Sequence, residues 1–531
     1  MKLKKVLAGV LAASSALTLA GCNNSTSTSS TTSKPATSGT TSAATSGTTS
    51  AATSGTTSAA TSDTTSGAAV TGGLTFDASK IKEGETIEVI TNRTDLVSTE
   101  DGGNGYFVEL VKPFEEKYKC TVKFRALKDY AKDLKQMMGS ANYGDVLNIP
   151  DSGLNPKKYD QYFEVLGTVG ELKDSYRDIT NKAQGEGDSA VVYGVASGCN
   201  ASGICYNKKV WADAGITEMP KTVDEFIADL QKIHDHDSSI VPVMCNYQAR
   251  DWNLKEYTQY APAVTGDPDF KTKLLVNGGD LFVKGEPYYE MCRMMFEIYK
   301  NPDLHESSVN DTVWDTSKML LAQGKVGTFI IGSWGLAQFK AEGKKNGVSD
   351  EDLENVAFMP VPMTASDGKQ YASVGADTNM AVNKNSSESK KELGKAYIKW
   401  LVEESTFDYD QGFVPTLKTG KMPEALSGFE SAGVEFFTVN QAPGAITTTF
   451  GNIDTKQAQV NIDGGADGNF KFTICETAMA GGSLEDFEKI LKDQNTKWAT
   501  ARDANEELKA FLATPEAEQY KDEKFAKKAD F

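Results

Sequence analysis

Side chains with planar hydrogen-bonding groups follow two apolar segments of the sequence. Arg93 and Asp95 come shortly after one such run, and Asn148 and Asp151 stand at the end of another. Guanidinium, carboxylate and amide groups can each meet two neighbouring hydroxyls in a fork, because a hydroxyl both donates and accepts hydrogen bonds. Such groups are therefore suited to bind a molecule that carries neighbouring hydroxyls. Two alternatives stay open: Arg93 pairs with Asp95 on the surface, and Asx residues beside Pro150 serve a turn.

Two tryptophans and two further polar residues extend this set. Trp334 stands just past the apolar run Val326–Ile331, and Trp252 lies in the polar aromatic stretch NYQARDWNLKEY. A tryptophan ring offers a large, rigid apolar surface to a ligand, although a Trp after an apolar run also fits simple core packing. Asn200, in a run of small residues, and Asp377, in VGADTNM, are further candidates, and Asn200 can instead serve only local geometry.

The usual catalytic motifs are missing from the sequence. It has three histidines, none in an H-E-x-x-H motif, and no phosphate loop with G-K-[ST]. Ile331 stands where a nucleophile elbow needs glycine. The run DGGADG, from Asp463 to Gly468, misses the spacing of a calcium loop. We therefore expect no enzyme, no catalytic residue, no cofactor and no metal site, although the 73 acidic residues leave a glycosidase with two carboxylates as an alternative.

Strands alternating with helices must position these residues. The apolar spacing predicts a helix from about 107 to 118 that breaks or begins near Pro113, and further helices over about 130–138, 223–233, 317–323 and 393–401. Such alternation indicates α/β architecture with parallel sheets covered on both faces. The predicted strands are Thr86–Ile90, Cys120–Ala126, Asp145–Ile149, Val326–Ile331 and Ala381–Val382.

The N-terminal segment is typical of an export signal. Lys2, Lys4 and Lys5 precede a short apolar core, and the sequence Leu-Ala-Gly-Cys ends at Cys22. This resembles a bacterial lipobox, which implies a signal peptide over 1–21 and lipid attachment at Cys22. The alternative is an ordinary signal peptide with a chance cysteine.

A low-complexity segment separates this signal from the rest. The octapeptide TSGTTSAA recurs within residues 22–73, which offer almost no apolar side chains to bury, so we expect a disordered linker. The chain carries a formal charge of −18, which argues against nucleic acid as a partner. We expect the six cysteines after Cys22 to be mostly small buried residues, although Cys199 and Cys205 are close enough in sequence to form a bridge.

Three stretches, in addition to the lipobox and linker, resemble one family. They read SGICYNKKVWADAGI followed by PKTVDEFIADL, then KMLLAQGKVGTFIIGSWGLAQF, then NMAVNKNSSESKKELGKAYIKWL. The chain resembles a family 1 extracellular solute-binding protein, the receptor of bacterial sugar-uptake ABC transporters. The resemblance implies a two-lobed periplasmic-binding-protein-like (type II) α/β fold, with discontinuous lobes joined by a hinge. The implied divisions are 74–197 plus 377–437 for the first lobe, 201–375 plus 438–509 for the second, and a C-terminal tail over 510–531.

The resemblance also implies a function. A monomeric receptor, anchored through Cys22 on the extracellular face of the cytoplasmic membrane, would close its lobes over a carbohydrate and deliver it to permease subunits. The implied contacts are Arg93, Asp95, Asn148, Asp151, Asn200, Trp252, Trp334 and Asp377. A surface-anchored glycoside hydrolase and a wall-associated glycan adhesin are the alternatives. A hydrolase would release products and an adhesin would need polymer, whereas a receptor binds soluble sugar and leaves it intact.

Overall fold

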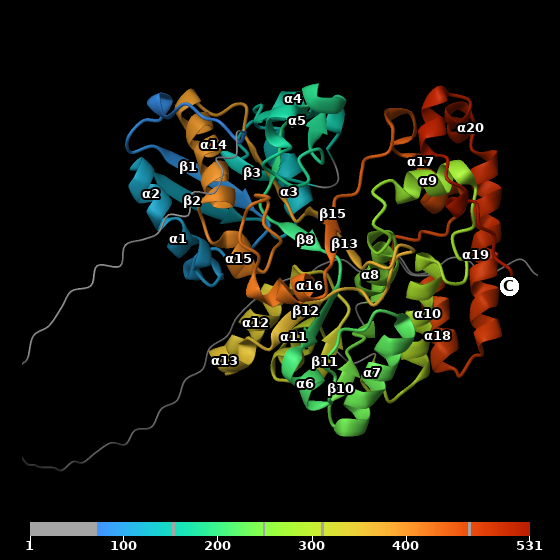
Figure 1. The fold of residues 1–531 in the computed structure, drawn as a ribbon. Coiled ribbons are helices and arrows are strands. Elements are labelled where there is room, and N and C mark those ends of the chain that lie inside the picture. Colours follow the sequence, from blue (N-terminus) through green and yellow to red (C-terminus); the bar gives the residue numbers. More distant parts are fainter. Residues whose placement is uncertain (1–71, 151–153, 248–249, 310–312, 466–468) are drawn as a thin grey trace, which may run out of the picture. The chain divides into compact units, whose positions relative to one another are not determined.

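The computed structural model describes residues 72–150, 154–247, 250–309, 313–465 and 469–531 (Figure 1). These residues belong to one compact unit, Ala68–Phe531. The predicted signal peptide, Cys22 and nearly all of the linker lie outside the described residues. Within the described part, no helix combines the length and apolar character needed to cross a membrane.

The first sheet has five strands in the order β2-β1-β3-β14-β7. The predicted parallel pairing is confirmed for three of them, because β1 pairs in parallel with both β2 and β3. β14 comes from a distant part of the chain and runs antiparallel to β3 and β7. The strands are β1 (Thr86–Thr91), β2 (Thr121–Ala126), β3 (Val146–Ile149), β7 (Val195–Ala196) and β14 (Asn379–Val382).

The helix expected near Pro113 is divided in two. α1 spans Tyr106–Leu110 and α2 spans Lys112–Tyr118, with Val111 between them. Proline has no amide hydrogen, so an α-helix accommodates it without disruption only in the first turn. Pro113 accordingly lies just inside the start of α2. Phe114 of α2 is buried and lies against Trp400 of α14 (Glu388–Glu403) at a ring-centroid distance of 5.3 Å.

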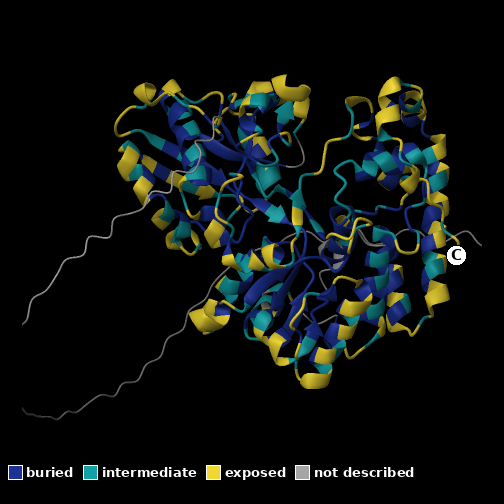
Figure 2. Ribbon diagram, viewed as in Figure 1, coloured by how far each residue is buried: buried dark blue, intermediate teal, exposed yellow. Residues whose placement is uncertain are grey.

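A second sheet has the order β10-β11-β9-β12. β10 and β11 are parallel, whereas β9 is antiparallel to both β11 and β12. Nearly all residues of these strands are buried, as the dark blue strands in Figure 2 show, which explains their continuous apolar sequences. The strands are β9 (Ile204–Asn207), β10 (Val241–Val243), β11 (Val326–Phe329) and β12 (Val356–Met359).

A small third sheet, β15-β13-β8, connects the other two. β8 (Cys199–Ala201) lies between β7 of the first sheet and β9 of the second, and β13 (Tyr371–Ala376) leads into β14. The chain crosses between the sheets a third time after α15 (Phe407–Gln411), where Val414 exchanges backbone hydrogen bonds of 2.8 and 2.9 Å with Cys199. These crossings form the hinge region. The third strand is β15 (Glu435–Phe437).

The other helices surround the sheets, and a short sheet β4-β6-β5 lies beside the first. The predicted helix at 223–233 is confirmed as α7, where the Thr222 side chain accepts a hydrogen bond from the Glu225 amide. The further helices are α3 (Tyr130–Met138), α4 (Tyr159–Tyr162), α5 (Val169–Leu172), α6 (Lys208–Asp213), α7 (Val223–His236), α8 (Arg250–Ala263), α9 (Phe270–Asn277), α10 (Pro287–Lys300), α11 (Trp314–Ala322), α12 (Gly335–Lys345), α13 (Asp350–Leu353), α16 (Ser427–Ser431), α17 (Thr449–Gly451), α18 (Phe470–Met479), α19 (Leu484–Ala504) and α20 (Glu506–Leu512). The short strands are β4 (Gly167–Thr168), β5 (Ala183–Gln184) and β6 (Val191–Val192).

Two segments have contacts that bear on the predicted lobe boundaries. Residues 424–437 contact the second sheet, where Phe429 of α16 stacks on Phe358 of β12 at 5.6 Å. Residues 510–531 lie on α9, where Phe525 meets Phe270 edge to face at 5.4 Å. All six described cysteines are buried and free, as expected from their scattered positions.

A buried carboxyl group lies at the hinge region. Asp408 of α15 is 8% exposed, and its Oδ2 accepts a hydrogen bond of 3.2 Å from the Thr416 amide. Its Oδ1 has no hydrogen-bond partner among the described residues, and it lies 2.9 Å from where a Cβ on Gly198 would stand. Glycine at 198 therefore makes room for this group. Burial raises the pKa of Asp408 to about 8, although the Thr416 hydrogen bond opposes the shift.

Replacing Asp408 with asparagine is expected to change how stability depends on pH. The folded protein keeps this proton up to a pH of about 8, whereas the unfolded chain loses it near the ordinary pKa of 3.8. Between these values the folded state binds more protons, so this group makes the wild type less stable as the pH rises. Asp408→Asn should therefore gain stability relative to the wild type between pH about 5 and about 8, measured by thermal melting. A Glu351→Gln control at an exposed site should show no such trend, and a pH-independent difference for Asp408→Asn would contradict the assignment.

Candidate functional site

Arg93 is held in a fixed orientation at the carboxyl end of β1. Its Nε and Nη2 donate hydrogen bonds of 2.9 and 2.8 Å to the two carboxylate oxygens of Asp95, so the pairing left open by the sequence is present. Nη2 also donates to Oε1 of Gln411 at 2.8 Å. Because a guanidinium has five N–H groups, these three bonds leave donors for a ligand.

The carboxylate of Asp95 stays ionised beside this arginine. Partial burial raises the pKa of Asp95, but the hydrogen bonds and charge of Arg93 outweigh burial and hold the pKa below its ordinary value. The charge of Lys318, in α11 beside the second sheet, lowers it further. Charged groups from both sheets therefore meet near Asp95.

Asn148 of β3 belongs to the same group of residues. Its Nδ2 donates a hydrogen bond of 3.0 Å to Oδ1 of Asn92, the neighbour of Arg93. Its backbone N–H and C=O both bond to the hydroxyl of Tyr130, each at 2.8 Å. The carboxyl ends of β1 and β3 thus bring Asn148 beside the Arg93 loop. Asp151 lies outside the described residues.

Asn200 and Asp377 form a pair at the hinge region. Nδ2 of Asn200 donates a hydrogen bond of 2.9 Å to Oδ1 of Asp377, and the Asp377 amide donates to the carbonyl of Gly198. Oδ1 of Asn200 is buried and has no hydrogen-bond partner among the described residues. A buried acceptor without a donor costs free energy in the folded protein.

Trp334 lies where the two sheets meet. It is half-buried, precedes α12, and contacts the apolar clusters of both the first and the second sheet. A Cβ on Gly332 would stand 2.8 Å from the Trp334 ring, so glycine is needed there. Trp334 therefore packs partly against core residues, as the core-packing alternative predicts. For Trp252 the structure describes the helix α8, while its side chain lies outside the described part.

A second tryptophan accompanies Trp334. The ring of Trp314, the first residue of α11, lies 6.1 Å from the Trp334 ring at an interplanar angle of 49°. Lys318, one turn along α11, places its ammonium 5.2 Å above the Trp314 ring. The cluster thus combines two aromatic rings with a cation and the Arg93–Asp95 pair, which suits a ligand with both apolar faces and hydroxyl groups.

Three of these residues were not predicted from the sequence as site residues: Gln411, Trp314 and Lys318. Gln411 and Arg93 are 318 residues apart in the sequence, so no local sequence pattern predicts their contact. Trp314 was within reach of sequence reasoning, because it opens a helix that precedes the strand leading to Trp334. In the described part, no three His, Cys, Asp or Glu side chains come together as a metal site would require.

Comparison with known proteins identifies related chains. Diacetylchitobiose binding protein DasA of Streptomyces coelicolor is 27% identical over 300 residues, which cover 55% of this chain and 64% of DasA. The alignment thus spans less than two thirds of that relative. Two solute-binding proteins of Bifidobacterium animalis subsp. lactis share the fold. BlMnBP1, solved with mannobiose, has a TM-score of 0.65 at 28% identity and covers 80% of this chain and 95% of its own. BlMnBP2, solved with mannotriose, has a TM-score of 0.65 at 25% identity over 80% and 96%.

These neighbours confirm the expected two-lobed α/β fold of type II. The sequence profile of the family described as "Bacterial extracellular solute-binding protein" matches residues 99–406, more than half of the chain. The chain belongs to the bacterial extracellular solute-binding protein family.

Proposed function

We propose that this protein is the substrate-binding receptor of an ABC importer and captures a short oligosaccharide between two lobes. Membership of the solute-binding family carries the proposal. DasA is named for diacetylchitobiose, and BlMnBP1 and BlMnBP2 were solved with mannobiose and mannotriose, which supports a carbohydrate of two or three units as the ligand. The proteins in this family and among these neighbours are binding proteins, which supports a receptor that leaves its ligand intact.

The proposed role of each site residue follows from its chemistry. Arg93, oriented by Asp95 and Gln411, donates to neighbouring sugar hydroxyls from the first lobe. Trp334, with Trp314 beside it, offers an aromatic surface to the CH face of a pyranose ring. The buried Oδ1 of Asn200 accepts a hydroxyl at the hinge region. The remaining predicted contacts, Asn148, Asp377, Asp151 and Trp252, complete the proposed set.

Closure of the lobes couples binding to transport. The first lobe comprises 74–197 and 377–423, and the second comprises 201–375 and 424–531. The contacts of 424–437 with β12 and of 510–531 with α9 support this change from the boundaries at 437 and 509. A ligand favours the closed state only through contacts that it makes there and not in the open state. A permease would then recognise the closed receptor.

A first prediction tests the receptor function. Titration of the unlipidated chain with mannobiose, mannotriose and diacetylchitobiose by calorimetry should show saturable 1:1 binding to at least one, with no products on chromatography. Trp334→Ala should weaken that binding by about 2 kcal/mol, roughly 30-fold, as expected for a central aromatic contact. Tyr409→Ala, which removes an exposed aromatic side chain of α15, should bind like the wild type. Because Trp334 also contacts core residues, Trp334→Phe serves as the milder variant. Absence of heat with all three sugars, or release of smaller sugars, would refute the proposal.

A second prediction concerns Gln411. Gln411→Ala removes the acceptor that orients Arg93, so the Kd for the sugar should rise several-fold. Gln411→Glu keeps an oxygen at this position and should retain most of the affinity. If the residue had only a structural role, both variants would lower the melting temperature and leave the Kd unchanged at temperatures where the protein is folded.

The membrane anchor is a further part of the proposal. Residues 1–21 are the signal peptide, Cys22 carries the lipid, and 22–73 form the linker to the receptor, which stands outside the cytoplasmic membrane as a monomer. The lipobox-like sequence before Cys22 supports this, since more than one acyl chain anchors a protein stably. Cys22→Ser should move the protein from the membrane fraction to the medium in cells that secrete it. A variant that still sediments with membranes after a salt wash would exclude Cys22 as the anchor.

A further inference from the structure

The helix α8 lies beside Trp334 of the candidate site. A Cβ on Gly332 would stand 3.0 Å from Nε1 of Trp334 and 3.4 Å from the hydroxyl oxygen of Tyr260, which belongs to α8. The Tyr260 hydroxyl therefore lies close to the indole ring. α8 also packs next to β13 of the hinge region (Figure 1). One face of this helix thus borders the candidate site.

Glu256 lies on the same face of α8. Residues four apart on an α-helix are neighbours, and Glu256 stands four residues after Trp252 and four before Tyr260. Burial raises the pKa of Tyr260 well above its ordinary value, and the negative charge of Glu256 raises it further, as expected for two neighbouring groups. The predicted contact at position 252 and two polar side chains thus follow one another along this face.

The two polar side chains are buried without adequate partners. Each is 6% exposed. The Tyr260 hydroxyl lies near the Glu256 carboxyl, yet it has no partner at hydrogen-bond distance among the described residues. Burial raises the pKa of Glu256 above its ordinary value of 4.5, although Tyr260 and the charge of Lys255 oppose the shift. Polar groups buried in this way cost free energy in the folded protein.

Other polar side chains in the second half of α8 are bonded within the protein. The hydroxyl of Thr258 donates to the carbonyl of Ile462, which also accepts a hydrogen bond of 2.6 Å from the Lys471 ammonium. Nε2 of Gln259 donates to the carbonyl of Asp463 at 3.1 Å. These bonds hold α8 in place, so the shortage of partners is a property of the face beside Trp334.

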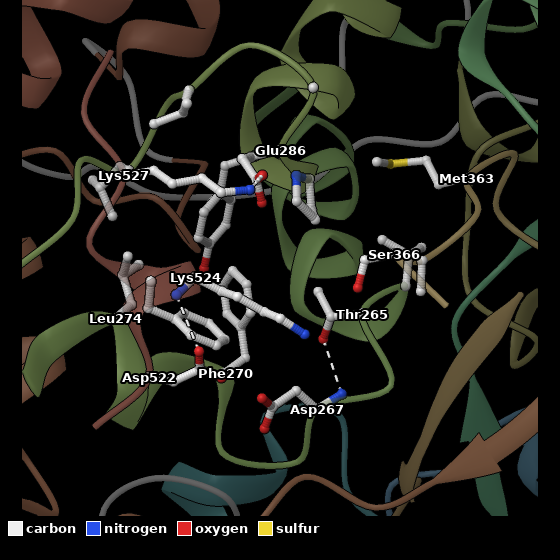
Figure 3. A pocket seen from close by; sticks show the side chains of 18 of the residues that line it. Thr265, Asp267, Phe270, Leu274, Glu286, Met363, Ser366, Asp522, Lys524 and Lys527 are labelled. Carbon is white, nitrogen blue, oxygen red and sulfur yellow. Dashed lines mark hydrogen bonds and ion pairs between the residues drawn. The ribbon is translucent and has the colours of Figure 1, made fainter. Parts of the chain in front are cut away.

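The cavity at the C-terminal end of α8 differs in this respect. It has a volume of about 330 Å³ and lies where the loop after α8 meets the start of α10 and the C-terminal segment (Figure 3). Its charged side chains offset one another, as in the pairs Asp267 with Lys273 at 2.6 Å and Asp280 with Lys528 at 2.9 Å. The walls of this cavity therefore favour no particular ligand, whereas the face beside Trp334 offers polar groups that a ligand can satisfy.

We propose that Glu256 and Tyr260 are specificity-determining contacts of the candidate site and bind hydroxyls of the sugar unit that stacks on Trp334. This inference rests on the proposed receptor function. The Glu256 carboxylate accepts hydrogen bonds from neighbouring hydroxyls, and the Tyr260 hydroxyl donates one to a sugar oxygen. Arg93 donates from the first lobe and Glu256 accepts from the second, so the two lobes recognise opposite hydrogen-bonding capacities of one ligand.

Conservative variants of the two residues test the proposal. Calorimetric titration of the unlipidated chain with mannobiose, mannotriose and diacetylchitobiose selects the sugar of highest affinity as the probe. Glu256→Gln, which keeps one acceptor oxygen, should weaken binding of this sugar about tenfold, and Tyr260→Phe should weaken it about fivefold. Tyr257→Phe is the matched control. It removes the hydroxyl of a buried tyrosine that belongs to the core of the second lobe, and it should bind as the wild type does.

Melting curves without sugar separate recognition from a structural role. Each variant removes a buried polar group that lacks a proper partner, so the melting temperature near neutral pH should stay the same or rise while the affinity falls. A lower melting temperature with an unchanged Kd would instead assign the two residues to the core and overturn the proposal.

Monodeoxy derivatives of the probe sugar test direct contact. A derivative that lacks a hydroxyl bound by Glu256 cannot make that bond in either protein, so Glu256→Gln should lose clearly less affinity for at least one derivative than for the parent sugar. An equal loss for every derivative would exclude the contact. If a sugar binds the wild type and both variants equally, only this inference fails. If none of the three sugars binds the wild type, the receptor function fails with it.

Discussion

The pairing of three chain crossings at the hinge region is the constraint on which the rest of the structure depends. β8 pairs with β13, and Cys199 exchanges hydrogen bonds with Val414 of the third crossing. Each crossing connects the first sheet to the second. Main-chain hydrogen bonds at this point tie segments far apart in sequence into one unit. The Asn200–Asp377 pair sits between two of these crossings, so the hinge itself contributes to the candidate site.

The helix α15 shows how closely the hinge and the site are connected. Within a few residues it provides the buried carboxyl of Asp408, the Gln411 oxygen that orients Arg93, and Gly412, whose left-handed conformation ends the helix. A Cβ on Gly412 would stand 3.1 Å from Leu336 of α12, the helix that follows Trp334. In the proposed site, a ligand bound by Arg93 would act through Gln411 on α15, which packs on α14 beside the first sheet and on α12 beside the second.

In the proposed receptor, polar groups at the sheet junction would serve recognition rather than maximal stability. A buried acceptor on Asn200 and a buried carboxyl oxygen on Asp408 each lack a hydrogen-bond partner among the described residues. Such groups cost free energy in the unliganded protein. A ligand hydroxyl that donates a hydrogen bond to such an acceptor removes this free-energy cost. A ligand without the matching hydroxyl does not, so the site gains selectivity.

Local helices and strands could be predicted from the order of residues, as could the types of side chain in the candidate site. Period-two and helical apolar spacing located β1, β2, β3 and α7, and Pro113 marked the start of α2, because these signals depend on neighbours a few residues away. In the sequence, Arg93 follows one predicted strand and Asn148 lies near the end of another. The contacts between distant segments appear only in the folded chain: Gln411 with Arg93, Trp314 beside Trp334, and the C-terminal segment on α9. The spacing of apolar residues indicates which face of a helix or strand is buried, but it does not indicate which distant segment covers that face.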